Sequence, residues 1–364
     1  MSRPRYFISP YNNIFQKERF LQCDLCPRRC IIPPGGEGSC KVRVNLGGSP
    51  ELPFYGFVTA LAKDPIEKKP LYHFRPGNEI LSAGFAGCNL HCPFCQNWHI
   101  SQNVSDRNDG ISGHRCSPQE LIAAAEKSAG KHGAAIAYTY SEPLVHIEFL
   151  LDCMMEARKA GVANVLVTNG CVNPEVAEEI LELTDAANID LKCFSEETYS
   201  KVLGSGMANQ PLAAVLNFIK TAVKNDVHIE LTTLVVPGLN DSEKELDACA
   251  DFIAGLYDNE KAITGKCPIP WHLSAYHPDW KWNAPATKPE HLTETASRAR
   301  ERLAYVYSGN VAGEENDTFC HNCGKSIISR RGYRVDTSGI SLKCKNEKPA
   351  YFCVFCGEQT PIRF

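Results

Sequence analysis

One short loop limits what this chain can be more than any other part of its sequence. Cysteines recur there as Cys88-x3-Cys92-x2-Cys95, directly after the apolar segment 79–86, which the pattern predicts as a buried strand. Three thiolates on one loop can bind three irons of a [4Fe–4S] cluster, and the fourth iron then stays open to a small molecule. Phe94, one place before the third cysteine, can shield such a cluster.

A zinc knuckle is the alternative for this loop, with His91 or His99 as a borrowed fourth ligand. Structural zinc sites usually supply four paired ligands, so the iron–sulfur cluster is favoured. The chain holds 18 cysteines among 364 residues, and its first residues lack the apolar core of a signal peptide. This cysteine usage predicts metal binding in a reducing cytoplasm rather than a disulfide framework.

Two further groups of four cysteines flank the central loop. The group near the N-terminus offers four soft ligands, which can close a zinc site or bind a further iron–sulfur cluster; four unligated thiols are the alternative. The group near the C-terminus forms two Cys-x2-Cys-Gly knuckles, which predict a zinc-ribbon or rubredoxin-like site that holds zinc or iron. The first group is Cys23, Cys26, Cys30 and Cys40, and the second is Cys320, Cys323, Cys353 and Cys356.

Composition bounds the class of protein. Hydrophobic residues make up 43% of the chain, which suffices for a sizeable core, and no apolar run is long enough to span a membrane. The net charge of −4 provides no basic field for nucleic acid. We expect three parts: a Cys-rich N-terminal region over 1–77, a barrel-sized domain over 78–312 and a metal-binding module over 313–364.

The middle of the chain alternates predicted strands with predicted helices. Such alternation implies a parallel sheet with right-handed crossovers, so the fold class is α/β, either an open or partial (β/α) barrel or a doubly wound sheet. Helix start signals occur at Ser117-Pro118-Gln119-Glu120, at Asn173-Pro174, at Ser242-Glu243 and at Thr287-Lys288-Pro289. Strands are expected at 79–86, 134–140, 164–168, 187–191, 228–236, 271–276 and 304–307.

Polar or hinge residues follow almost every predicted strand. Chemistry in parallel barrels takes place at the carboxyl ends of the strands, so these residues are expected to surround one site. The segment Asp64–Phe74 either lines that site or wraps a surface, and composition does not decide between the two. The strand-end candidates are Thr139, Ser141, Glu142, Asn169, Cys171, Asp190, Lys192, Cys193 and His272.

Taken together, these motifs resemble the radical S-adenosylmethionine (SAM) enzymes of the AmmeMemoRadiSam system, which are relatives of pyruvate formate-lyase activating enzymes. The resemblance runs through nearly the whole chain. It rests on the three cysteine groups and on the blocks Asp64–Phe74, Tyr138–Pro143, Val167–Gly170, Ile189–Lys192, Leu234–Asn240 and Val306–Asn310, with Arg330–Tyr333 in the tail.

The resemblance implies a partial (β/α)6 radical SAM barrel in which SAM chelates the open iron. An electron from the cluster then cleaves the sulfonium and releases a 5′-deoxyadenosyl radical. Phe94 is expected to flank the adenine, Lys192 to bind the carboxylate, and Thr139, Ser141 or Glu142 to accept from the amine. Asn169, Asp190 or His272 suits the ribose hydroxyls.

Three positions depart from the pattern of this branch: Cys171, Cys193 and Ser141. We expect Cys171 and Cys193 to open toward the cavity, where either thiol can donate a hydrogen atom to a substrate radical, bind an auxiliary metal or only fill space. Alkylation is then expected to label them ahead of Cys153 and Cys249, which lie in predicted helices.

The predicted function is hydrogen abstraction from an unknown substrate, which can be a small molecule, a peptide or a partner protein. An external electron donor is required. A glycyl-radical activase that acts on a partner protein is the alternative within this class. A zinc-ribbon scaffold or nucleic-acid-binding protein is the alternative from another class, and the acidic balance and polar strand ends speak against it.

Overall fold

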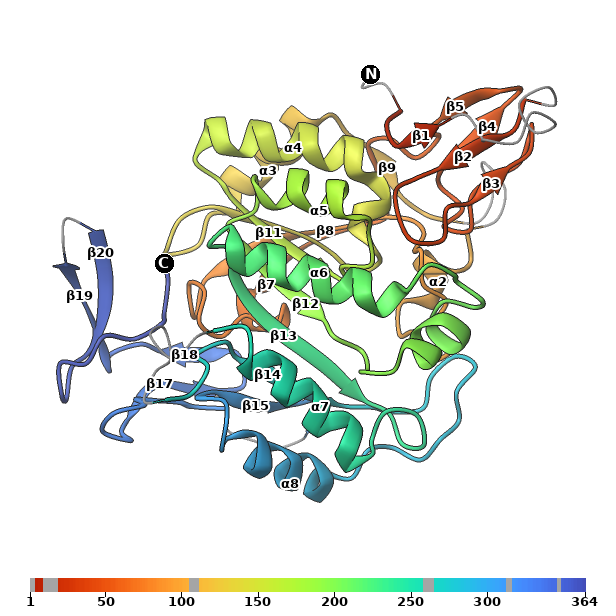
Figure 1. Ribbon diagram of the computed structural model, residues 1–364. Helices are drawn as coiled ribbons and strands as arrows, with labels where there is room; N and C mark the ends of the chain where they lie inside the picture. The colour runs from red at the N-terminus through yellow and green to blue at the C-terminus, as the bar shows by residue number, and fades with distance from the viewer. Residues whose placement is uncertain (1–3, 9–18, 105–110, 258–264, 312–315, 346–347) are drawn as a thin grey trace.

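The protein is seen in a computed structural model that describes residues 4–8, 19–104, 111–257, 265–311, 316–345 and 348–364. Its centre is an eight-stranded sheet in the order β15-β14-β13-β12-β11-β10-β8-β7 (Figure 1). All neighbours pair in parallel except β7 and β8. The strands are β7 (Ala60–Pro65), β8 (Glu79–Gly84), β10 (Ala135–Thr139), β11 (Ala163–Thr168), β12 (Ala186–Asp190), β13 (His228–Val235), β14 (Trp271–Ala275) and β15 (Val306–Gly309).

The seven parallel strands follow one another across the sheet in chain order. A doubly wound sheet would reverse direction at a switch point, so that alternative is excluded. Among the described strands, β7 and β15 each pair on one side only, which leaves the sheet open.

Six of these strands are each followed by a helix that packs on the same face of the sheet (Figure 1). Buried apolar side chains from both layers form one continuous core. The helices are α3 (Pro118–Lys127), α4 (Ile147–Ala160), α5 (Pro174–Leu181), α6 (Pro211–Lys224), α7 (Glu243–Ala254) and α8 (Pro289–Ala299).

The expected start signals mark the helix starts, but only two act through a capping hydrogen bond. Ser117 and Glu120 form the reciprocal capping box of α3, and Ser242 caps α7. Asn173 stands at the start of α5, yet its amide donates to the carbonyl oxygen of Asp24. These polar residues therefore mark the helix starts by sequence, while tertiary contacts decide how each side chain is used.

The N-terminal region packs against the sheet and shares its core. Arg43 forms a fully buried bidentate pair with Glu148 of α4 (2.9 and 3.0 Å). Strand β7 belongs to the central sheet although it precedes residue 77, so the expected boundary at 77/78 does not separate two folding units. The region also contains β1 (Phe7–Ile8), β2 (Leu21–Cys23), β3 (Ile31–Ile32), β4 (Val44–Leu46), β5 (Ser49–Glu51), β6 (Phe57–Val58) and η1 (Ile66–Lys68), and β6 pairs with β9 (His114–Arg115).

The C-terminal module lies at the amino ends of the strands, the opposite side of the sheet from the cysteine loop (Figure 1). Arg363 bridges to Phe74 and pairs with Asp226, just before β13. The module has its own small apolar cluster. The expected boundary at 312/313 lies outside the described residues. Its strands are β16 (Thr318–Phe319), β17 (Ser326–Arg331), β18 (Arg334–Asp336), β19 (Ile340–Lys345) and β20 (Lys348–Cys353).

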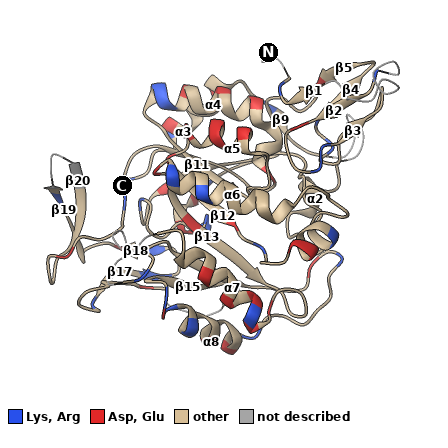
Figure 2. Ribbon diagram, viewed as in Figure 1, with Lys and Arg blue, Asp and Glu red and all other residues tan. Residues whose placement is uncertain are grey.

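Charged residues of both signs are interspersed over the helices, in keeping with the small net charge (Figure 2). None of the helices in the described part of the chain has both the length and the apolar character that crossing a membrane requires.

Candidate active site

The cysteine loop leaves the sheet at the carboxyl end of β8 and runs to the short helix α2 (Trp98–Ser101). Gly87 begins the loop with a φ of +81°, and a side chain there would meet the carbonyl oxygen of Cys40 at 2.3 Å, so only glycine fits. The backbone N–H of His91 donates to the carbonyl oxygen of Leu203 (2.6 Å), which ends the π-helical turn η3 (Thr198–Leu203). The path of the loop is therefore fixed on both sides.

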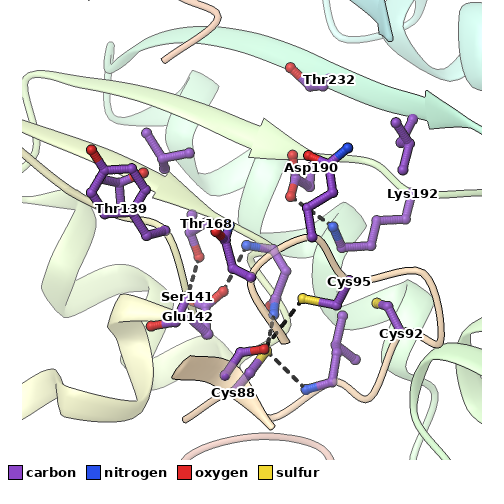
Figure 3. A pocket seen from close by; sticks show the side chains of 18 of the residues that line it. Cys88, Cys92, Cys95, Thr139, Ser141, Glu142, Thr168, Asp190, Lys192 and Thr232 are labelled. Atoms are coloured by element: carbon purple, nitrogen blue, oxygen red, sulfur yellow. Dashed lines mark hydrogen bonds and ion pairs between the residues drawn. The ribbon is translucent and has the colours of Figure 1, made fainter. Parts of the chain in front are cut away.

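A cavity of about 320 Å³ opens beside this loop, and all three cysteines, Cys88, Cys92 and Cys95, line it (Figure 3). The strands bring the strand-end candidates to the same place, because parallel strands end at one edge of a sheet. Seven of the eight residues expected to contact SAM line the cavity: Phe94, Thr139, Ser141, Glu142, Asn169, Asp190 and Lys192.

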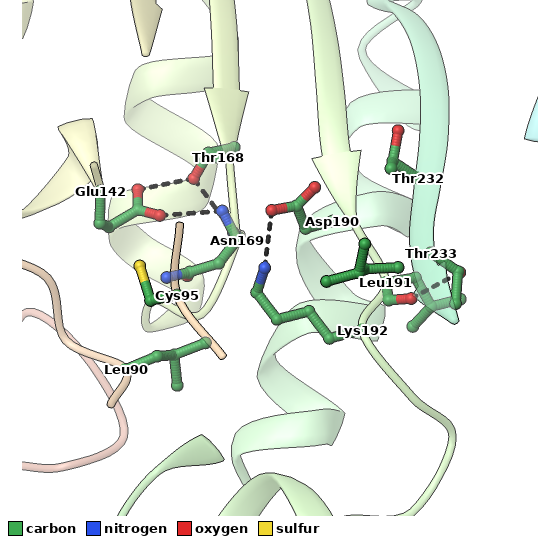
Figure 4. Close-up of polar contacts among 12 residues, drawn as sticks. Leu90, Cys95, Glu142, Thr168, Asn169, Asp190, Leu191, Lys192, Thr232 and Thr233 are labelled. Atoms are coloured by element: carbon green, nitrogen blue, oxygen red, sulfur yellow. Dashed lines mark hydrogen bonds and ion pairs between the residues drawn. The ribbon is translucent and has the colours of Figure 1, made fainter. Parts of the chain in front are cut away.

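Glu142 joins the ends of neighbouring strands (Figure 4). Its buried carboxylate accepts hydrogen bonds from the Thr168 hydroxyl (2.7 Å), the Asn169 backbone N–H (2.8 Å) and the Leu144 backbone N–H (3.0 Å). Burial raises the pKa of Glu142 to about 7, although these three donors oppose the rise. The carboxylate therefore positions the strand ends β10 and β11, with the short turn η2 (Pro143–His146) behind it.

Lys192 and Asp190 both line the cavity and form an ion pair, with Nζ 2.7 Å from Oδ2 (Figures 3 and 4). Burial opposes the charge on Lys192, but Asp190 and the thiols of Cys92 and Cys88 outweigh it, and the pKa of Lys192 is raised. The cavity thus presents a permanent cation beside the three cysteines.

Asn169 connects the end of β11 to the cysteine loop. Its amide lies 3.7 Å from the sulfur of Cys88 and donates to the side-chain oxygen of Asn89 (3.0 Å). The Asn89 amide in turn donates to the carbonyl oxygen of Cys171 (2.6 Å). This chain of amides orients one cysteine of the loop toward the cavity.

Several cavity residues were not assigned from the sequence. Tyr140 has a φ of +69°, an unusual conformation for a bulky residue, and its hydroxyl donates to Asp64 (2.7 Å). Asp64 also pairs with buried Lys69 (2.9 Å), whose ammonium lies over the Tyr140 ring. Lys68 and Lys69 of the segment Asp64–Phe74 therefore line the site, a point that composition alone left open.

A second group of missed residues lies on the inner face of the last strands: Thr232, Ser274 and Asn310. Asn310 follows the end of β15 directly, as the assigned residues follow theirs. The same positional signal would have identified it.

His272, expected as a ribose ligand, lies outside the cavity lining. It is buried below the cavity, where its Nε2 lies 2.7 Å from Glu230 and its ring stacks on Tyr307. The residue two places further along β14, Ser274, reaches the cavity instead. The expectation named the correct face of β14 but a position too deep in the sheet.

Cys171 and Cys193 do not open toward the cavity, which corrects the expectation made for both. Each is fully buried; the Cys171 sulfur lies 3.8 Å from that of Met207, and the Cys193 sulfur 3.7 Å from the carbonyl oxygen of Ser195. For Cys193 the reason is alternation along the chain, because the preceding Lys192 faces the cavity. For Cys171 the reason is the turn at Gly170, whose φ of +62° redirects the chain after Asn169. Cys153 and Cys249 are equally buried, so no preferential alkylation is expected.

The four N-terminal cysteines gather beside the loop. Burial raises the pKa of Cys40 to about 12, and the neighbouring thiols Cys23 and Cys30 raise it further. Burial also raises the pKa of Cys26, again with the other three thiols adding to the rise. Each thiol is therefore within electrostatic range of the others.

The four C-terminal cysteines lie closer together. Their sulfurs are all within 4.8 Å of one another, as a single tetrahedral ion requires. A hydrogen bond from the backbone of Glu358 lowers the pKa of Cys356 to about 7. Cys344 is exposed and stands outside this group. The predicted pairing of the two knuckles is confirmed.

The comparisons with known proteins decide the family. The profile of the Radical SAM superfamily matches residues 84–250. An uncharacterized protein of Methanocaldococcus jannaschii is 36% identical over 345 residues, which cover 94% of this chain and 95% of that protein. The chain belongs to the radical SAM superfamily.

Other radical SAM relatives match more remotely. The pyruvate formate-lyase 1-activating enzyme of Escherichia coli (strain K12) is 26% identical over 207 residues, covering 55% of this chain and 76% of that enzyme. A solved domain of a pyruvate-formate lyase-activating enzyme from Bacteroides vulgatus is 21% identical, with a TM-score of 0.40, and covers 49% of this chain and 100% of that domain.

As a radical SAM protein, the chain is an enzyme, and its family implies a [4Fe–4S] cluster and SAM. The residues present fit both groups. Cys88, Cys92 and Cys95 line the cavity as three thiolate donors, and no other cysteine lines it among the described residues. Three donors leave one iron for a small molecule.

Proposed function

We propose that this enzyme cleaves SAM reductively at a [4Fe–4S] cluster held by Cys88, Cys92 and Cys95, and abstracts hydrogen from a substrate. The arrangement of these three cysteines beside one cavity lined by polar strand ends supports the proposal most strongly. When bound, the cluster supplies the electron that splits the sulfonium into methionine and a 5′-deoxyadenosyl radical.

The cation of Lys192 binds the carboxylate of SAM in this proposal. Its partner Asp190 keeps the ammonium charged and directed into the cavity. Asp190 retains a second carboxylate oxygen for a ribose hydroxyl, and Asn169 lines the same cavity for the same purpose.

The amine of SAM requires hydrogen-bond acceptors at the end of β10. Thr139 lines the cavity there. Ser141 donates its hydroxyl to the carbonyl oxygen of Phe85 (2.7 Å), and the Glu142 carboxylate already accepts three hydrogen bonds. We therefore assign Ser141 and Glu142 to positioning the strand end, and Thr139 with the backbone to the amine.

Phe94 closes the cavity beside the cysteines. Its buried ring packs edge-on against Tyr276 at 6.4 Å. An aromatic face held in this way can flank the adenine of SAM and exclude water from the reacting bond. An external donor supplies the electron, because the chemistry consumes one for each SAM cleaved.

The substrate can be a small molecule, a peptide or a partner protein. A glycyl-radical activase is the second candidate, favoured by the similarity to pyruvate formate-lyase activating enzymes over 207 residues. The zinc-only scaffold is set aside, because the chain is an enzyme of the radical SAM superfamily.

Incubation of the anaerobically reconstituted protein with SAM and dithionite tests the proposal. We expect 5′-deoxyadenosine and methionine in equal amounts. A glycyl-radical signal on a candidate partner protein, seen by electron paramagnetic resonance, would select the activase. Neither product from a protein that contains its iron would contradict the proposed function.

A further inference from the structure

We propose that Cys23, Cys26, Cys30 and Cys40 hold a second iron–sulfur cluster, which passes electrons to the cluster at the central loop. The position of this cysteine group in the fold, the spacing of its thiols and the unpartnered Nε–H groups of two arginines carry the inference. Its electron-transfer role rests on the proposed function above, whereas the presence of the cluster does not.

Hydrogen bonds hold the four cysteines together. The backbone N–H of Cys23 donates to the carbonyl oxygen of Cys30 (2.9 Å), and the sulfur of Cys30 accepts from the backbone N–H of Ser39 (3.4 Å). Cys23, Cys26 and Cys40 are buried and Cys30 is half-buried. Residues far apart in the segment are thus held close together.

The spacing of the thiols favours a cluster over a single ion. Four sulfurs around one zinc lie about 3.8 Å apart, given Zn–S bonds of about 2.3 Å. The C-terminal cysteines meet this condition, but no three of the N-terminal sulfurs lie within 4.8 Å of one another in the described chain. In a cluster each thiolate binds a different iron, so the sulfurs lie farther apart.

The central loop provides an internal comparison. Cys88, Cys92 and Cys95 carry the cluster motif of the superfamily, and they too stand outside the single-ion spacing among the described residues. The N-terminal group therefore resembles the cluster loop and differs from the tail. Because it has four cysteines instead of three, its cluster has no open iron for SAM.

Two arginines next to these thiols have donors without partners. Arg43 is fully buried near Cys23 and Cys40, and Arg28 lies near Cys30. The Nε–H groups of both arginines are buried and have no hydrogen-bond partner among the described residues. Buried donors are rarely left unpaired, so an acceptor belongs beside them. The sulfides and thiolates of an anionic cluster would supply it.

This group of cysteines contacts the central loop directly. The hydroxyl of Ser39, next to Cys40, lies 2.7 Å from Nε2 of His91, next to Cys92. The carbonyl oxygen of Cys40 also packs against Gly87. A path of one hydrogen bond, between Ser39 and His91, and a few covalent bonds therefore connects Cys40 of the proposed second cluster to Cys92 of the first.

This connection suits transfer of one electron at a time. The reduced second cluster gives one electron to the first and is itself oxidised by one electron. A low-potential one-electron donor protein restores it. No proton or atom moves in this step.

Metal and sulfide analysis of the anaerobically reconstituted full-length protein tests the proposal. We expect about eight irons per chain if both sites hold four-iron clusters, and about four in the Cys88→Ala/Cys92→Ala/Cys95→Ala variant. The Cys26→Ser/Cys40→Ser variant should also lose about four irons. The electron paramagnetic resonance signal of its remaining cluster, at the central loop, should still change when SAM is added. Cys153→Ser, a buried cysteine of α4, is the matched control and should keep all iron.

Loss of all iron from the central triple variant, or zinc bound through Cys26 and Cys40, would overturn the proposal. The iron content of the central triple variant does not depend on how the Cys26→Ser/Cys40→Ser variant folds. The relay is tested by 5′-deoxyadenosine formation in Cys26→Ser/Cys40→Ser. We expect at least tenfold slower turnover with a reduced flavoprotein donor and an unchanged rate with dithionite. If 5′-deoxyadenosine formation in this variant slows equally with both donors, or slows with neither, the second cluster does not relay electrons. Failure of the wild type with dithionite would instead contradict the proposed function.

Discussion

The ammonium of Lys192 lies 2.7 Å from the carboxylate of Asp190, and both side chains line the cavity that the three loop cysteines share. The two residues are separated by one position at the end of β12, so they project from the strand to the same side. The pair thus holds a cation where the carboxylate of SAM is proposed to bind.

Lys192→Ala should weaken SAM binding about 10- to 100-fold, because a hydrogen bond to a charged group contributes about 1.5–3 kcal/mol. Its raised pKa keeps Lys192 charged from pH 6 to 9, so this contribution should not change over that range. Equilibrium binding to the anaerobic protein measures both. His272→Gln is the matched control and should bind SAM normally, because His272 lies below the cavity. An unchanged affinity in Lys192→Ala would remove Lys192 from the site.

Glu142 should make stability depend on pH. Its native pKa of about 7 exceeds the usual value of 4.5, so the folded state holds this proton more tightly than the unfolded state. The contribution is therefore complete below about pH 4.5 and is lost as the pH rises through 7. The Tm of wild type minus that of Glu142→Gln should therefore fall between pH 5 and pH 8, because the glutamine cannot ionise. A value of this difference that rises over the same range would refute the assignment.

Metal removal should unfold the C-terminal module. Its apolar cluster is small, so the metal must supply much of its stability. Limited proteolysis of Cys320→Ser/Cys353→Ser should cut within 316–364 and leave the sheet resistant. Cys344→Ser, outside the four-cysteine group, should keep both metal and resistance. An uncut tail in the first variant would show that the module folds without metal.

The module is also expected to stabilise the sheet, through Arg330. Its guanidinium stacks on Tyr72 (4.3 Å), donates to the Tyr72 carbonyl oxygen (2.7 Å) and lies 3.9 Å from buried Glu67. Unfolding of the tail would leave that carboxylate without its cation. A lower Tm of the sheet should therefore accompany the proteolytic sensitivity.

Cys171 and Cys193 should resist alkylation in the native protein. Both are fully buried, whereas Cys344 in β19 is exposed and should react first. Addition of SAM should change neither rate, because neither thiol lines the cavity. Mass spectrometry after a short exposure to iodoacetamide measures all three. Rapid labelling of Cys193 that SAM slows would restore it to the cavity.

Much of the fold follows from local pattern. Each predicted strand lies within about two residues of an observed one, because runs of buried apolar residues ended by polar residues are distinctive in parallel sheets. The strand ends also located the site, since topology alone brings Thr139, Asn169 and Lys192 to one edge.

The sequence could not show how far below the cavity a residue lies in the sheet, or whether a residue after a strand faces the cavity or the helices. His272 shares its face of β14 with Ser274, and only the packing of Tyr307 and Glu230 shows that it lies below the cavity. Cys171 turns away because Gly170, with a φ of +62°, redirects the chain after Asn169. Such turns depend on tertiary contacts that a one-dimensional pattern does not contain.

Long-range partners were likewise out of reach. Asp64 and Tyr140 are 76 residues apart, and nothing in either segment indicates that they bond. Glu142 looked like an amine ligand because it ends a strand. Its three hydrogen-bond donors, which come from β11, the chain after it and η2, became visible only in three dimensions.

Reductive cleavage of SAM by the anaerobic, iron-loaded protein is the most direct test of the central claim. With dithionite, wild type should form 5′-deoxyadenosine, while Cys88→Ala/Cys92→Ala/Cys95→Ala should form none and lose one cluster's iron. Retention of both iron content and 5′-deoxyadenosine formation in the triple variant would contradict the claim.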